Sequence, residues 1–89
     1  MKVYQVSKKT FFVSNGNEYE TDVDMENDVK IYTTFEKAEK VFNEFVDYAS
    51  TAFMAEPKVL NHLGLVYWST EIKGYDRRML VEFVTKEIY

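Results

Sequence analysis

Hydrophobic and polar residues alternate along the first third of the chain, as they do in a β-strand with one buried face. Segments 2–6 and 10–13 are rich in β-branched and aromatic residues, which favour strands. Residues 14–17 read Ser-Asn-Gly-Asn, and the Asn-Gly dipeptide is typical of a tight type I′ turn. We therefore expect a β-hairpin with its turn at residues 15–16.

The alternation continues beyond this turn with acidic residues in the polar positions. Odd positions are mostly apolar, and the even positions are the six carboxylates Glu18, Glu20, Asp22, Asp24, Glu26 and Asp28. One long strand or two strands broken near Asn27 would satisfy the pattern. Since strands are usually about 5 to 6 residues long, the break is favoured.

The strongest helix pattern follows. Thr33, with Glu36 three residues later, predicts an N-cap and a capping box. Apolar residues then recur at three-and-four spacing and predict one buried face on a helix from about Thr34 to Ala55. Pro57 stops this helix, and residues 57–63 are expected to add one short turn that Gly64 ends.

The last quarter returns to alternation, with strands expected over residues 66–72 and 78–89 and a turn over residues 73–76. The predicted fold class is α+β: an antiparallel sheet in β-β-α-β-β order with one long helix packed on one face. A chain of 89 residues is expected to form a single domain over residues 1–89.

Composition narrows the setting of this domain. There is no cysteine, so disulfides and thiolate metal sites are excluded and a reducing compartment fits. The N-terminus lacks the apolar run of a signal peptide, and no stretch approaches the roughly 20 apolar residues that span a bilayer. We expect a cytoplasmic protein that does not bind a membrane, located in the host cell cytoplasm if a phage encodes it.

Negative charge is concentrated in one segment. Six of the fifteen carboxylates lie within residues 17–28, and this segment has no Lys or Arg. On a strand, alternate residues are about 6.7 Å apart on one face, a spacing of the order of the phosphates in nucleic acid. The segment therefore predicts a surface that occupies a basic groove built for DNA or RNA. The alternative is a solvated strand face whose acids only keep the protein soluble.

Metal binding is a further interpretation of the same segment. Residues 22–27 resemble the start of a calcium loop, but that loop needs Gly at its sixth position and Glu at its twelfth, where this chain has Asn27 and Thr33. Loose binding of divalent cations by clustered carboxylates stays open, while no specific metal site is predicted.

No pattern indicates catalysis. His62 is the single histidine, and Gly16, Gly64 and Gly74 are too far apart to form a phosphate-binding loop. We expect no enzyme activity and no cofactor.

Aromatic residues make up 17% of the chain, too many for the core of so small a domain. Exposed Tyr beside charge is typical of protein interfaces, so Tyr19, Tyr67 and Tyr75 are predicted to join the six carboxylates in binding a partner. The low isoelectric point argues against direct binding to nucleic acid.

Residues 31–38 (Ile-Tyr-Thr-Thr-Phe-Glu-Lys-Ala) and 41–44 (Val-Phe-Asn-Glu) give residues 28–48 a resemblance to small uncharacterised proteins of phages and mobile elements. This resemblance implies an accessory protein, and some acidic phage proteins of this size are anti-CRISPR or other anti-defence inhibitors that mimic nucleic acid. It assigns no functional residue.

Two functions are therefore predicted. The first is a non-enzymatic, anti-CRISPR-like inhibitor whose acidic strand binds the basic surface of a nucleic-acid-binding defence protein. The alternative is a homodimeric interaction module in which an aromatic surface or a free sheet edge is self-complementary and the acidic face only solubilises.

Overall fold

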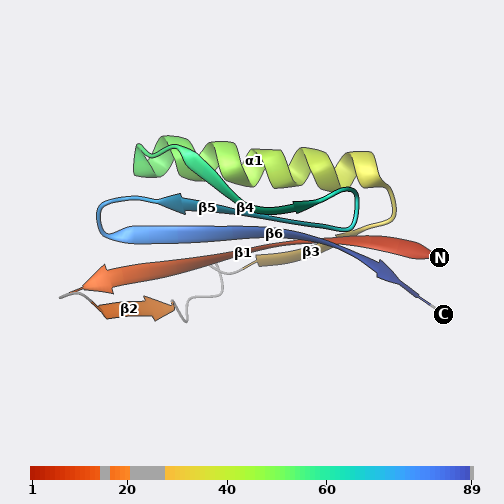
Figure 1. The fold of residues 1–89 in the computed structure, drawn as a ribbon, viewed down its shortest axis with the longest axis horizontal. Coiled ribbons are helices and arrows are strands. Elements are labelled where there is room, and N and C mark those ends of the chain that lie inside the picture. The colour runs from red at the N-terminus through yellow and green to blue at the C-terminus, as the bar shows by residue number, and fades with distance from the viewer. Residues whose placement is uncertain (15–16, 21–27, 89) are drawn as a thin grey trace.

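The computed structural model describes residues 1–14, 17–20 and 28–88 and has an α+β fold (Figure 1). The elements of that part of the chain are, in order, β1 (Lys2–Ser14), β2 (Asn17–Glu20), β3 (Asp28–Tyr32), α1 (Phe35–Phe53), β4 (Pro57–Leu63), β5 (Tyr67–Lys73) and β6 (Arg77–Glu87). All the paired strands are antiparallel, and α1 lies on one face of the sheet. The predicted class is confirmed, but the order has two more strands than the predicted β-β-α-β-β.

The sheet is built around its two longest strands. The strand order is β2-β1-β6-β5-β4, and β3 also pairs with β1. β2 pairs with residues 11–14 of β1 and β3 pairs with residues 4–8, so both occupy the same edge of β1. The predicted second strand is thus divided into two strands, as its length favoured. The predicted turn at residues 15–16 lies outside the described residues, although the Ser14–Asn17 pairing is that of a hairpin.

β4 replaces a helical turn that the sequence predicted. Residues 57–63 pair with β5 across a turn in which Gly64 has a φ of 55°. All seven residues of β4 are exposed, so this strand has no buried face that alternating apolar residues would mark in the sequence. Pro57 stands first in the strand, a position that needs no ladder donor. The helical prediction was wrong because pairing with β5, a tertiary contact, decides this segment.

The helix begins and ends differently from its prediction. Its N-cap is Thr34 instead of Thr33, and no side chain caps it, so the predicted capping box is absent. At the other end Met54 adopts the left-handed conformation with a φ of 51°, and its backbone N–H donates to the carbonyls of Ser50 and Thr51. The Ser50 hydroxyl donates to the Ala55 carbonyl at 2.6 Å, which closes the last turn.

The core lies between α1 and the centre of the sheet. Along the helix, Ala38, Phe42, Val46 and Ala49 are buried at the three-and-four spacing that the sequence showed. The sheet contributes the buried residues Val6, Ile72, Met79, Val81 and Phe83. The helix packs against β1, β3, β5 and β6, whereas β4 lies at the edge of the sheet.

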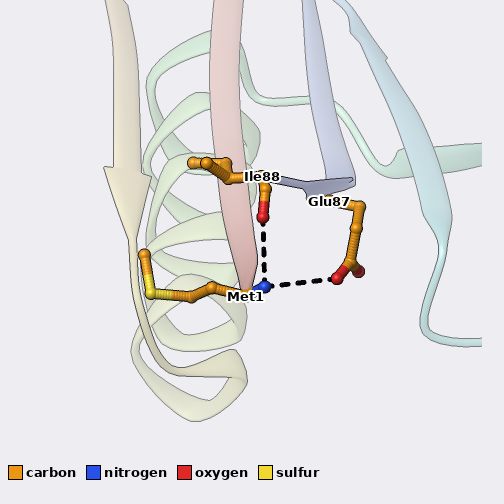
Figure 2. A network of polar contacts seen from close by, with 3 residues as sticks. All are labelled: Met1, Glu87 and Ile88. Carbon is orange, nitrogen blue, oxygen red and sulfur yellow. Dashed lines mark hydrogen bonds and ion pairs between the residues drawn. The ribbon is translucent and has the colours of Figure 1, made fainter.

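The two ends of the described chain meet beside the sheet. The Met1 ammonium donates to Glu87 Oε1 at 3.3 Å and to the Ile88 carbonyl at 3.1 Å (Figure 2). The Ile88 N–H donates in return to the Met1 carbonyl at 2.7 Å. These contacts extend the β1–β6 pairing to its end. Among the described residues, no helix has the length and apolar character needed to cross a membrane.

Candidate functional site

The predicted acidic site falls on two strands and the segment between them. Glu18, Tyr19 and Glu20 belong to β2, and Asp28 is the first residue of β3. The remaining three carboxylates, Asp22, Asp24 and Glu26, lie outside the described residues.

The pairing register excludes one continuous acidic strand. Glu20 is opposite Phe11 and Asp28 is opposite Lys8. Seven residues separate Glu20 from Asp28, but only two residues of β1 separate their partners. An unbroken strand would need equal separations, because antiparallel partners are matched one to one. Of the two arrangements that the sequence left open, the register therefore favours two strands, and the positions of Asp22, Asp24 and Glu26 lie outside the described residues.

The predicted tyrosines do not converge on one surface. Tyr75 lies in the turn between β5 and β6 and is fully exposed. This turn is close to Arg77, which pairs with Phe12, so Tyr75 is at the same end of the sheet as β2. Tyr67 pairs with Val84 at the other end of β5. The fold therefore brings Tyr75, but not Tyr67, to the end of the sheet that holds Tyr19.

Tyr67 has an intramolecular partner. Its hydroxyl donates to Glu82 Oε2 at 2.7 Å across the β5–β6 pair. This hydrogen bond to a carboxylate, with partial burial, raises the pKa of Tyr67 above its ordinary value. Arg78 pairs with Glu71 on the same face of the sheet, at 3.1 Å, and its guanidinium lies 4.4 Å from the centre of the Phe11 ring. These contacts hold the side chains of this face to one another.

A groove that the sequence did not predict lies between α1 and β4. Its volume is about 240 Å³, and its lining residues are Glu39, Phe42, Asn43, Val59, Asn61, His62, Trp68 and Thr70. Trp68 forms part of its wall and belongs to an aromatic cluster, with ring centres 5.6 Å from Phe42 and 4.8 Å from Phe83. The indole N–H donates to the Gly64 carbonyl, which fixes the orientation of the ring.

Polar groups stand around this apolar wall. The exposed His62 ring packs edge-on against Trp68, with ring centres 4.9 Å apart. Asn61 Nδ2 donates to Ser69 Oγ at 3.3 Å. Thr70 is only 4% exposed, and its side chain makes no hydrogen bond to any residue that the structure describes. A buried hydroxyl without a partner is unusual in a folded protein.

Sequence reasoning missed the groove because it assigned residues 57–63 to a helical turn. The lining residues come from one helix and two strands, and only the pairing of β4 with β5 brings Val59 and His62 beside Trp68 and Thr70. The sequence carries no signal that would have indicated this edge, because all the residues of β4 are exposed and its pairing is with β5.

Within residues 1–14, 17–20 and 28–88, no three His, Asp or Glu side chains are grouped so that they could hold a metal ion. The groove combines an aromatic wall with a few polar groups, an arrangement typical of recognition sites. Comparison of the chain with protein-family models, curated proteins and solved structures found no match.

Proposed function

We propose that the protein is a non-enzymatic interaction protein that inhibits a nucleic-acid-binding partner by occupying its basic surface. The observation that carries this proposal is the charge of residues 17–28, which combine six carboxylates with no Lys or Arg. An ordinary solvated strand mixes charges of both signs, because like charges repel one another.

The site consists of Glu18, Glu20, Asp22, Asp24, Glu26 and Asp28, with Tyr19 and Tyr75 at the same end of the sheet. Carboxylates that replace phosphates in a basic groove speed association by long-range attraction and compete with the partner's DNA or RNA. The resemblance to small phage proteins suggests that the partner is a defence protein, as for an anti-CRISPR, and that the protein acts in the cytoplasm.

The experiment compares two variants with the same loss of charge. The test variant carries Asp22→Asn, Asp24→Asn and Glu26→Gln, and the control carries Glu44→Gln, Asp47→Asn and Glu56→Gln at exposed positions on and after α1. Each protein is immobilised and incubated with an extract of the cells that produce it. We expect the unmodified protein and the control to retain a nucleic-acid-binding protein that added DNA or RNA and added salt displace, and the test variant to lose it.

Two results would contradict this function. Equal retention by the test and control variants would show that net charge, not the acidic segment, attracts the partner. A partner that binds unchanged in the presence of excess nucleic acid would show that the contact lies outside the nucleic-acid groove.

A homodimeric module is the second candidate, and a specific observation favours it. Val29 and Ile31 of β3 are about 60% exposed. They point away from the helix, because Lys30 between them lies over the Phe45 ring of α1. β6, the last strand in the sequence, cannot provide a free sheet edge for such a dimer, because it is central and pairs with both β1 and β5. Light scattering tests the dimer, which a Val29→Lys, Ile31→Lys variant should convert to a monomer.

A further inference from the structure

We propose that the α1–β4 groove, together with the adjoining edge of β4, binds an extended peptide segment of a partner protein by strand addition. The segment pairs its backbone with β4 and inserts one large side chain, carrying a hydrogen-bonding atom, beside Trp68 and Thr70. A Lys or Arg of the segment lies near Glu39. This surface is separate from the acidic segment, so the inference does not rest on the proposed function.

The first support is the open backbone of β4. It is the last strand in the sheet order, and among the described residues only β5 pairs with it. Edge strands are often protected by Pro, Lys or a bulge. β4 has all three, but Pro57, Lys58 and the irregularity between Val59 and Asn61 all lie before its last three residues. Asn61–Leu63 is therefore the part of the edge that stays open to a partner strand.

The second support is the size of the groove. Small-molecule sites usually have volumes above about 300 Å³, so a groove of about 240 Å³ is too small for a typical cofactor. It is large enough for one aromatic or branched side chain. An added strand presents alternate side chains to the same face, so one residue of the segment enters the groove while its neighbours point away.

The third support is the chemistry of the lining residues. Phe42, Val59 and Trp68 give an apolar and aromatic wall, which selects a large apolar or aromatic side chain. The buried Thr70 hydroxyl has no side-chain partner in the described structure, so a polar atom on the inserted side chain would satisfy it. A Tyr side chain meets both requirements.

The fourth support is charge. Glu39 lines the groove, and no described residue forms an ion pair with its carboxylate. A Lys or Arg one or two residues from the inserted side chain would complement it. Leu63 and Leu65 are both more than 60% exposed at the open end of β4 and offer further apolar surface to the same segment.

The experiment uses a displayed library of random 12-residue peptides, selected on the full protein. We expect the selected peptides to share a Tyr or another large side chain with a Lys or Arg nearby. Their binding is then measured through Trp68, the single tryptophan of the chain, whose fluorescence reports directly on the groove. Selection that yields no shared pattern, or binding that leaves this fluorescence unchanged, would overturn the proposal.

Protein variants test the side-chain contacts. Glu39→Gln should lower the affinity for the selected peptides by about two- to fivefold, as expected for the loss of a surface ion pair. The matched Glu44→Gln should leave the affinity unchanged. Thr70→Val should weaken them by about three- to tenfold through loss of one hydrogen bond. For Thr70→Val, both the peptide affinity and the stability of the free protein are measured. The change should lower the affinity without destabilising the free protein. Equal affinities in all three variants would contradict the assigned contacts.

Peptide variants test strand addition. A selected peptide is N-methylated at alternate positions in two complementary sets. In one set, methylation removes the N–H groups that pair with β4, and the affinity should fall at least about tenfold. In the other set, methylation removes N–H groups that point to solvent, and the peptide should bind normally. Equal effects of the two sets would overturn strand addition. The Asn61–Leu63 amides could instead become protected from hydrogen exchange when the protein self-associates without peptide. That result would show that a second copy of this chain pairs with β4.

Discussion

Two hydroxyl groups of β5 differ in how the fold satisfies them. The Tyr67 hydroxyl donates to Glu82 at 2.7 Å at the start of the strand. The Thr70 hydroxyl, three residues later, is buried beside the groove without a described side-chain partner. Because an unsatisfied buried hydroxyl costs free energy, these residues contribute to stability with opposite signs.

Thr70→Val should therefore raise the free energy of unfolding by about 1 kcal/mol, since a methyl group of nearly the same volume replaces an unsatisfied hydroxyl. Urea denaturation followed by Trp68 fluorescence measures this change. Ser69→Ala is the matched control, because Ser69 accepts a hydrogen bond from Asn61 and its loss should lower stability. A destabilised Thr70→Val protein would show that the hydroxyl has a partner.

Tyr67→Phe should be less stable than the unmodified protein by about 0.5 to 1.5 kcal/mol near pH 7, because it loses the hydrogen bond to Glu82. The fold raises the pKa of Tyr67 above its ordinary value of 10.0, so it favours the protonated form. This contribution is fully present below pH 10 and is lost as the pH rises through the raised pKa. Denaturation from pH 7 to 11 should show the difference shrinking above pH 10, while the fully exposed Tyr75→Phe should show none at any pH.

At the scale of elements, the end of α1 carries a strained residue. Met54 closes the helix with a φ of 51° although the residue is 92% exposed, so packing does not offset its conformation. The left-handed region costs a residue with a Cβ about 1 to 2 kcal/mol, and glycine avoids that cost.

Met54→Gly should accordingly stabilise the protein by about 0.5 to 1 kcal/mol, after allowance for the greater flexibility of glycine in the unfolded chain. Thermal denaturation compares it with Met54→Ala, which keeps the strain and should change stability little. If glycine gives no more stability than alanine, the helix ends in another conformation.

At the scale of the whole molecule, charge is distributed unevenly. On α1, Lys37 and Lys40 stand among the acidic residues, and on the sheet Glu71 pairs with Arg78, whereas every charged residue within 17–28 is acidic. Repulsion among these acids disfavours the compact state and is screened by salt.

The variant with Asp22→Asn, Asp24→Asn and Glu26→Gln should therefore melt at the same or a slightly higher temperature. Its free energy of unfolding should rise by no more than about 1 kcal/mol. The gain should be largest at low salt. Melting with Ca²⁺ or Mg²⁺ and with a chelator separates the two origins of any change, because a cation site would make the variant less stable only when the cation is present.

Periodicity within the sequence determined the elements that have a buried face. The helix and the strands β1, β5 and β6 each bury one side, so apolar spacing marks them, and the α+β class follows from their order. The concentration of acid in residues 17–28 is likewise a property of the sequence. Only the tertiary structure determines that residues 57–63 form the strand β4, because an exposed edge strand has no buried face and its hydrogen bonds are made with β5. It also decided the division of β2 from β3 through their register on β1, and the groove beside Trp68, because residues distant in sequence meet there only after the sheet has formed.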